Sequence, residues 1–225
     1  MLISHLHRFI YTKTFKTAGT SVESYFEPFC MGPDEWALSH DREAYESAYG
    51  VIGYRGPHLE AGMRWWNHMP AAEVKAAVGD AVWQRYYKFC VVRNPFDRAV
   101  SAFYFARSKG RLPPSDAPDP VQMERWLAAG GLRMDRDQYL IDGRLVMDRV
   151  LHHERLHTDL QDLCDTLELP WQPERLPTFK AGIRPAGAAL EELYTPRSRA
   201  LVASQCAYEL DQFGYSFPAP LPMAA

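Results

Sequence analysis

The feature that most constrains the fold is an apolar run, Tyr87-Lys-Phe-Cys-Val-Val92, that leads directly into Arg93-Asn-Pro-Phe-Asp-Arg-Ala-Val-Ser101. The apolar run predicts a buried strand. Asn94 is typical of a helix N-cap and Pro95 of a first helical residue, so a helix is predicted over 95–108. A strand that passes straight into a helix is typical of α/β sheets, which bind ligands at the carboxyl ends of their strands.

Basic and hydroxyl side chains gather at this predicted strand end. Arg93 would stand where the strand ends, while Arg98 and Ser101 are three residues apart and share one helix face. Two guanidinium groups, a hydroxyl group and the positive end of a helix predict an anion pocket. Arginine side chains that pair with surface acids would give the same pattern, so a second site is needed to decide.

A second candidate anion site lies near the amino terminus. Phe9-Ile-Tyr-Thr12 predicts a strand, residues 21–29 predict a helix, and Lys16-Thr-Ala-Gly-Thr-Ser21 lies between them. In such a loop glycine lets backbone N–H groups approach an anion and lysine adds a full charge, although the Walker A pattern is absent. The alternative is that Thr20 and Glu23 form a helix capping box, which leaves the rest of the loop without explanation.

Composition limits the classes of function. The net charge of −3 and the isoelectric point near 6.2 exclude broad nucleic-acid binding, so any anion site must be local. The four cysteines are scattered without a C-x-x-C pair, which favours reduced thiols and a cytoplasmic protein. We expect no membrane span and no signal peptide, because no segment approaches the ~20 apolar residues that a span needs.

The remaining elements alternate between strands and helices. Further helices are predicted over 70–86, 122–129, 154–167 and 197–212, and a further strand over 145–151. This alternation predicts an α/β fold with a mainly parallel central sheet flanked by helices. We expect one domain over residues 1–217 and a frayed tail over 218–225.

Together the two motifs resemble those of sulfotransferases that use 3′-phosphoadenosine 5′-phosphosulfate (PAPS). Lys16-Thr-Ala-Gly-Thr-Ser21 resembles their 5′-phosphosulfate loop, and Arg93-x-Pro-x-x-Arg-x-x-Ser101 resembles their 3′-phosphate motif. The resemblance is closest to the carbohydrate-type sulfotransferases (sulfotransferase family 2), including the heparan and chondroitin groups and bacterial relatives. It extends weakly through residues 150–156 and 213–217.

This resemblance implies a fold and an activity. The fold would be three-layered, like that of the P-loop NTPases, in a single sulfotransferase domain. The activity would be in-line transfer of the sulfuryl group of PAPS to an acceptor hydroxyl, expected to be that of a carbohydrate. The second product would be adenosine 3′,5′-bisphosphate (PAP).

The resemblance also assigns roles to matching residues. Lys16 would contact the bridging and sulfuryl oxygens, and Arg93 and Ser101 would hold the 3′-phosphate. The 5′-phosphate would be held by Thr17, Ala18, Gly19, Thr20 and Ser21. Lys180 and Arg184 lie where the family often has a basic loop that closes over the nucleotide. No metal is expected, because lysine, arginine and backbone donors can neutralise the leaving phosphate.

The base that removes the acceptor's proton is expected between the two motifs. His58, in Tyr54-Arg-Gly-Pro-His-Leu-Glu60, resembles the base of the uronyl 2-O-sulfotransferases, and an imidazole titrates near neutral pH. Glu60, His40 and His68 are the alternatives.

Two other classes of function stay open. His153-Glu-Arg-Leu-His157 matches H-E-x-x-H, the zinc-peptidase pattern, in which both histidines bind zinc and Glu154 is the base. That pattern requires both histidines on one helix, whereas residues 145–151 predict a strand that ends just before them. A third class is a protein that binds the nucleotide without catalysis, because it lacks a base.

Overall fold

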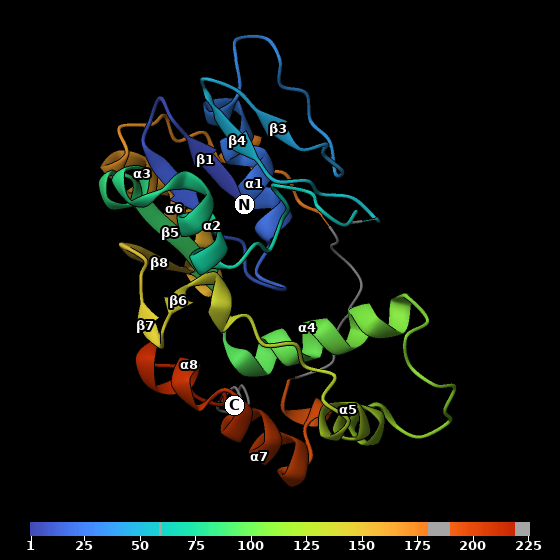
Figure 1. The fold of residues 1–225 in the computed structure, drawn as a ribbon. Coiled ribbons are helices and arrows are strands. Elements are labelled where there is room, and N and C mark those ends of the chain that lie inside the picture. Colours follow the sequence, from blue (N-terminus) through green and yellow to red (C-terminus); the bar gives the residue numbers. More distant parts are fainter. Residues whose placement is uncertain (59, 180–189, 219–225) are drawn as a thin grey trace. The chain divides into compact units, whose positions relative to one another are not determined.

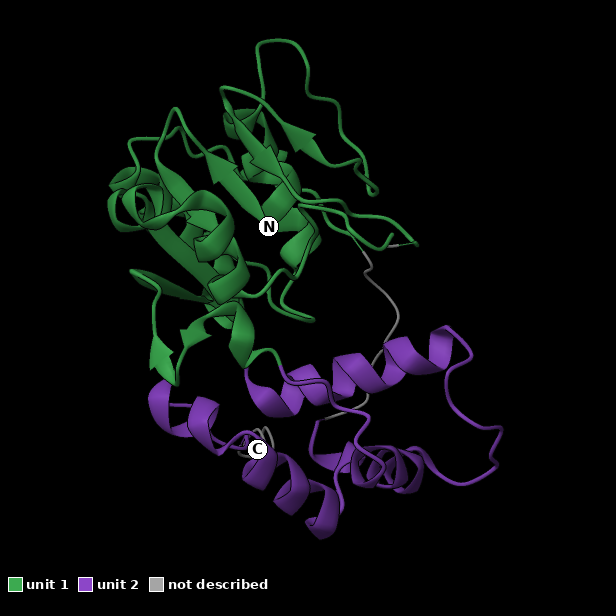
Figure 2. Cartoon of the chain, viewed as in Figure 1, with its two compact units in different colours: residues 1–92, 135–179 green, residues 93–134, 180–225 purple. Residues whose placement is uncertain are grey.

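The computed structural model describes residues 1–58, 60–179 and 190–218. Contacts within the chain divide it into two compact units, which are described separately (Figure 2). Unit 1 comprises Met1–Val92 and Asp135–Phe179, and unit 2 comprises Arg93–Met134 and Lys180–Ala225. The boundary between Val92 and Arg93 lies at the junction of the predicted strand and helix.

Unit 1 is built around a mixed sheet (Figure 1). Within the described residues its six strands are, in sheet order, β3 (Tyr45–Glu46), β4 (Gly50–Ile52), β1 (Leu2–Ser4), β2 (Phe9–Tyr11), β5 (Tyr87–Val92) and β8 (Arg149–His152). β2, β5 and β8 run parallel, whereas β1 is antiparallel to both β2 and β4, and β3 is antiparallel to β4.

The expected mainly parallel sheet is therefore confirmed only for β2, β5 and β8. The other half departs from it because β1 returns through the short turn Ser4–Phe9, and a turn of that length joins only antiparallel strands. β1 was not predicted at all, since three apolar residues at a chain end give too short a pattern to recognise. The α/β class is confirmed, but the sheet is mixed.

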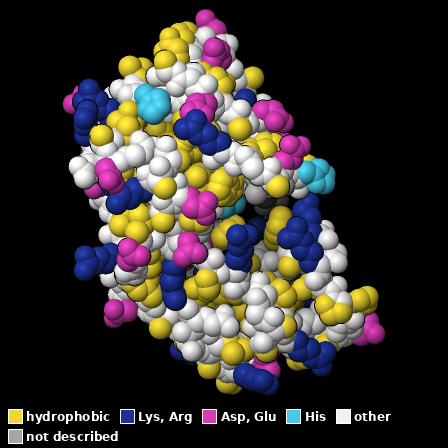
Figure 3. Space-filling view, in the orientation of Figure 1, with side chains coloured by type: hydrophobic (Ala, Val, Ile, Leu, Met, Phe, Trp, Pro, Cys, Tyr) yellow, Lys and Arg dark blue, Asp and Glu magenta, His cyan; other side chains and the backbone are white. Residues whose placement is uncertain are grey.

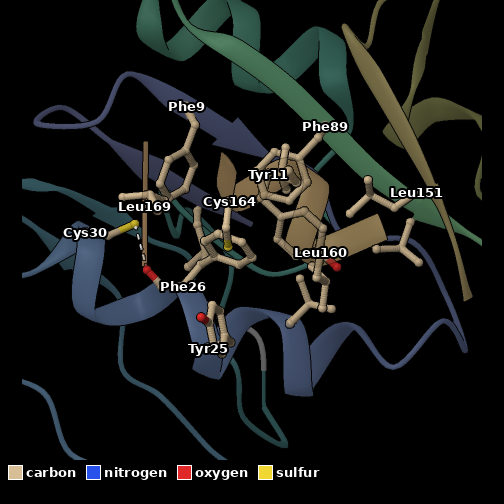
Figure 4. Packing of buried hydrophobic residues seen from close by; sticks show 14 of the residues in the cluster. Phe9, Tyr11, Tyr25, Phe26, Cys30, Phe89, Leu151, Leu160, Cys164 and Leu169 are labelled. Atoms are coloured by element: carbon tan, nitrogen blue, oxygen red, sulfur yellow. Dashed lines mark hydrogen bonds between the residues drawn. The ribbon is translucent and has the colours of Figure 1, made fainter. Parts of the chain in front are cut away.

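Helices cover both faces of this sheet. They are α1 (Gly19–Phe26), α2 (Ala71–Val78), α3 (Asp80–Arg85) and α6 (Leu156–Thr166). α1 and α6 pack on one face, where Phe26 and Leu160 meet Phe9 and Phe89 in the core (Figure 4). Lys88 alternates in direction with Phe89, and its Nζ donates to the Trp83 carbonyl of α3. α3 therefore lies on the opposite face.

Short elements complete unit 1. They are the hairpin β6 (Leu140–Ile141) and β7 (Arg144–Leu145) and the 3-10 turns η1 (Glu27–Cys30), η2 (Arg136–Gln138), η3 (His153–Arg155) and η4 (Pro173–Arg175). The hairpin pairs Leu140 with Leu145 outside the main sheet. The Lys16 loop, residues 12–18, joins β2 to α1.

Unit 2 is helical in its described part. It contains α4 (Pro95–Ser108), α5 (Asp119–Ala128), η5 (Glu191–Leu193), α7 (Pro196–Gln205) and α8 (Ala207–Gln212). Its core is formed by apolar side chains of α4, α5 and α7, among them Phe103, Met123 and Val202. α4 begins as predicted: Asn94 Oδ1 accepts the Phe96 N–H at 3.0 Å and Pro95 is the first helical residue.

Three predicted elements are wrong in their extent. The helix over 70–86 is divided at Gly79, whose φ of +79° ends α2 before α3 begins. The predicted strand over 145–151 is two strands, β7 and β8, which belong to different sheets. The last helix is divided at Cys206, whose φ of −107° and ψ of 25° lie outside the helical region. The strand over 87–92 and the helix over 95–108 are confirmed.

The surface charges, the cysteines and the lengths of the helices bear on the expectations drawn from composition. Basic and acidic side chains are scattered among apolar ones over the face drawn in Figure 3. All four cysteines are buried and none forms a disulfide, as expected from their scattered positions. Among the described residues, no helix is both long enough and apolar enough to cross a membrane.

Candidate functional site

The backbone of the Lys16 loop turns sharply before α1. Lys16 and Ala18 have φ angles of 63° and 59°, in the left-handed region that residues with a Cβ seldom adopt. Ala18 is the N-cap of α1, and its methyl side chain gives no capping hydrogen bond. The first N–H groups of a helix have no partner inside the helix, so this end of α1 is suited to an anion. Backbone strain of this kind is typical of binding sites.

The capping-box alternative for Thr20 and Glu23 is wrong. Because α1 begins at Gly19 rather than Ser21, Thr20 lies inside its first turn and not at the N-cap. Both side chains bind Lys13 instead: Lys13 Nζ donates to Thr20 Oγ1 at 3.2 Å and to Glu23 Oε2 at 2.6 Å. The two residues therefore stabilise the loop through a lysine that the sequence did not single out.

Glu23 is the centre of a buried ion cluster beneath the loop. Its carboxylate is fully buried and pairs with Lys13 Nζ and the Met1 ammonium at 2.6 Å, and with Arg55 at 2.9 Å. Burial alone would raise the pKa of Glu23, but these cations hold it well below the ordinary carboxylate value. Arg55 also binds Glu27 of η1 at 2.7 Å, so Arg55 joins two buried carboxylates, one on α1 and one just after it.

Gly19 is required by the path of Lys13. A Cβ at position 19 would lie 2.7 Å from Lys13 Cγ and 2.9 Å from its Cε, which is closer than real contacts allow. The stem of Lys13 thus runs across the start of α1 before its ammonium reaches Glu23. The glycine is expected to let an anion approach the backbone, and the structure adds a packing requirement.

Hydrogen bonds attach the loop to the carboxyl end of β5. Thr14 Oγ1 lies 2.8 Å from Thr17 Oγ1 and also donates to the carbonyl of Val91, one residue before the end of β5. On the other side, the Phe15 N–H donates to Asp135 Oδ2 at 2.8 Å. The loop thus lies at the strand end from which the chain continues into Arg93.

His68 lies against the same loop. Its ring stacks on Phe15 with centroids 4.2 Å apart, and its Nδ1 is 3.0 Å from the carbonyl of Lys13. Gln138 Nε2 donates to the His68 carbonyl at 2.9 Å. Burial, and next the positive charge of Lys13, lower the pKa of His68 to about 3, so the ring is neutral at physiological pH.

The other candidate bases stand in exposed positions. His58 and Glu60 are both exposed and flank residue 59, which the structure does not describe. His40 is exposed as well, with its Nδ1 2.8 Å from Asp41 Oδ1 and its ring against Phe179. Of the four residues considered from the sequence, His68 is the one in contact with the Lys16 loop.

The arginines of the 93–101 segment have different surroundings in unit 2. Arg93 pairs with Asp97 one turn along α4, with Nε 2.7 Å from Oδ2. Arg98 is only 3% exposed and donates to the carbonyl of Arg133 at 3.2 Å, so it is part of the packing of unit 2. Ser101 is half-buried. Arg93 therefore has the acidic partner that the ion-pair interpretation expects, and the anion pocket at the start of α4 stays a prediction.

Two predicted residues cannot be placed. Lys180 and Arg184 lie outside the described residues, so their proposed loop over the nucleotide stays a prediction.

The zinc-peptidase pattern is not on a single α-helix. His153 lies in the 3-10 turn η3, while His157 lies in α6, and Arg155 between them has φ −132° and ψ 34°. This break removes the one-turn spacing on a common face that two zinc ligands need. No group of three or more His, Cys, Asp or Glu side chains in the described ranges is placed to hold a metal ion.

Three contributors to the loop were missed from the sequence. Lys13 and Thr14 were visible beside the motif, but nothing local shows that a lysine turns inward to a glutamate. Asp135 lies 120 residues from Phe15, and no sequence pattern links the two.

The comparison with protein families agrees with this geometry. A model described as the sulfotransferase family matches residues 1–126 of the 225-residue chain, a segment that contains both the Lys16 loop and Arg93 to Ser101. No curated protein and no solved structure matches the chain. Because the matched segment exceeds half of the sequence, the chain belongs to the sulfotransferase family.

Proposed function

We propose that the protein transfers the sulfuryl group of PAPS to a hydroxyl group of a carbohydrate and releases PAP. The observation that carries the proposal is the Lys16 loop: a strained turn with a lysine stands before an uncapped helix start, at the carboxyl end of a parallel strand. The family supports sulfuryl transfer in general. The choice of PAPS and of a carbohydrate rests on the resemblance of the two motifs.

The Lys16 loop would hold the 5′ end of the nucleotide. Backbone N–H groups at the start of α1 would bind the 5′-phosphate together with the hydroxyl groups of Thr17, Thr20 and Ser21, beside Ala18 and Gly19. Lys16 would neutralise the charge that develops on the bridging oxygen when the sulfur–oxygen bond breaks. The resemblance gives this role to Lys16, whereas Lys13 pairs with the buried Glu23.

Arg93 and Ser101 would hold the 3′-phosphate. Arg93 is the residue that follows β5, whose carboxyl end is bound to the Lys16 loop through Thr14. A phosphate would compete with Asp97 for the Arg93 guanidinium, and it would be favoured by the start of α4. The resemblance further gives Lys180 and Arg184 the role of a basic loop that would close over the nucleotide.

Removal of the acceptor's proton needs a base, and the resemblance proposes His58. This histidine is exposed, where an incoming sugar can reach it. A base adds about 10²- to 10⁴-fold to the rate. If the protein bound PAP but never transferred the sulfuryl group, it would belong to the class that binds the nucleotide without catalysis.

Calorimetric titration with PAP tests the proposal. The native protein should bind PAP, and Lys16→Ala and Arg93→Ala should each weaken binding by about 10- to 100-fold, the effect of a lost charge-assisted hydrogen bond. Lys75→Ala and Arg149→Ala are the matched controls, because these side chains pair with Asp80 and Asp162 in exposed positions. PAP affinity that is the same in all five proteins would refute the nucleotide site.

Turnover is measured separately. The native protein is incubated with PAPS and a panel of carbohydrate acceptors, and the release of PAP is followed by chromatography. Acceptor-dependent release supports a carbohydrate sulfotransferase, whereas release with phenols or small alcohols alone would move the acceptor to another class.

A further inference from the structure

His68 has the surroundings of a positioned base rather than of a core histidine. Its ring is stacked on Phe15, the residue before Lys16, and its Nδ1 lies 3.0 Å from the Lys13 carbonyl. The residue is half-buried rather than fully enclosed. These contacts all lie within unit 1.

The hydrogen bond at Nδ1 fixes the tautomer of the ring. A carbonyl oxygen can only accept a hydrogen bond. Nδ1 therefore carries the proton, and its N–H donates to the backbone carbonyl of Lys13. In a neutral imidazole the lone pair is then on Nε2. Within the described part of the chain Nε2 has no hydrogen-bond partner, so it is available to a hydroxyl group brought to the loop.

Hydrogen bonds from residues 135–138 also hold the backbone of His68 and of Phe15 in place. Gln138 binds the His68 carbonyl, while Asp135, in the same short segment, binds the Phe15 N–H. One segment therefore binds the backbone of both residues whose rings stack. Each of them is fixed relative to Lys16, which would face the reacting sulfur.

We propose that His68 is the base of the transfer, the role that the resemblance gives to His58; the inference rests on the proposed function. The acceptor oxygen forms a bond to sulfur while its proton moves to His68 Nε2. The bond between sulfur and the 5′-phosphate oxygen breaks, and PAP leaves with the electron pair. The imidazolium then returns its proton to solvent.

The charges around the ring link its basicity to the nucleotide. Burial, and next the positive charge of Lys13, lower the pKa of His68; the Met1 ammonium lowers it further, whereas Glu23 raises it. A bound phosphosulfate brings negative charge to the neighbouring loop, which makes the ring more basic. His68 would thus be a stronger base when the donor is present than when it is absent.

The test compares His68→Asn with His157→Asn. Asparagine at position 68 tolerates the left-handed φ of 56° and can still donate to the Lys13 carbonyl, but it has no basic nitrogen. His68→Asn should bind PAP within about twofold of the native protein and lose kcat by about 10²-fold or more. His157→Asn, an exposed histidine on α6, should keep both properties.

A kcat for His68→Asn within a few-fold of native would overturn the inference. If His58→Asn loses turnover in the same assay, the base is His58 instead. Binding of PAP distinguishes failure of the proposed function from failure of the role given to His68. If the native protein binds no PAP, the proposed function itself is refuted. If PAP binds and His68→Asn is active, only the role of His68 is refuted.

A second measurement uses the native protein and requires no acceptor. The pKa of His68 is followed by NMR of the labelled imidazole in the native protein, with and without PAP. The inference predicts that PAP raises this pKa by at least one unit. A pKa that PAP leaves unchanged would contradict it.

Discussion

Replacement of Glu23 by Gln tests the ion cluster beneath the Lys16 loop. The substitution keeps the shape of the side chain and removes its charge, so that Lys13, Arg55 and the Met1 ammonium lose their common partner. Breaking a buried pair while leaving its cation in place costs about 3–5 kcal/mol. Glu27 still pairs with Arg55, which places our expectation near the lower end of that range, at about 3 kcal/mol.

The assay is denaturant unfolding, with the free energy of unfolding extrapolated to water. Asp162→Asn is the control, because Asp162 is 55% exposed and pairs with Arg149 at 3.0 Å. An exposed pair of this kind contributes at most about 1 kcal/mol. Glu23→Gln should also weaken PAP binding, since Lys13 crosses the start of α1 on its way to Glu23.

A double variant locates the cause. Lys13→Met removes one buried cation, so adding it to Glu23→Gln should cost less than the sum of the two single changes. Equal effects of Glu23→Gln and Asp162→Asn, or strict additivity with Lys13→Met, would refute the account of the cluster.

Three further predictions concern the loop, the helix start and pH. Gly19→Ala should weaken PAP binding by about 10-fold in calorimetry, because its Cβ would displace Lys13; unchanged affinity would contradict this. Asn94→Ala should lower the free energy of unfolding by about 1 kcal/mol through loss of the N-cap of α4, and an unchanged value would argue against that cap. The pKa of His68 is lowered from 6.5 to about 3 on folding, so the stability that the neutral ring gives is complete above pH 6.5 and is lost as the pH falls toward 3. Unfolding measured from pH 7 to 4.5 should therefore show a loss of up to about 1.4 kcal/mol per pH unit that His68→Asn reduces, and an identical pH dependence in both proteins would contradict it.

Much of the fold could be predicted because its signals are local. The apolar run 87–92 and the pair Asn94-Pro95 define β5 and the start of α4 through burial and capping alone. The failures arise where neighbours in space decide. β1 exists because it pairs with β2 and β4, and Gly79 divides a helix whose apolar pattern continues across it.

The candidate site, like the fold, could be predicted only where its signals are local. Lys16 and its glycine could be recognised from residue types between a strand and a helix. The contacts that hold the loop could not, because Asp135 and His68 are brought to it only by folding. The resemblance favours His58 as the base, whereas the structure places His68 against the loop.

The most direct test of the central claim is whether the protein distinguishes the two ends of one nucleotide. The affinities of PAP and of adenosine 5′-monophosphate, which lacks the 3′-phosphate, are measured by calorimetry for the native protein and for Arg93→Ala. We predict that the native protein prefers PAP by about 10- to 100-fold and that Arg93→Ala largely loses this preference. Equal affinity for the two nucleotides in the native protein, or a preference that survives Arg93→Ala, would contradict the account.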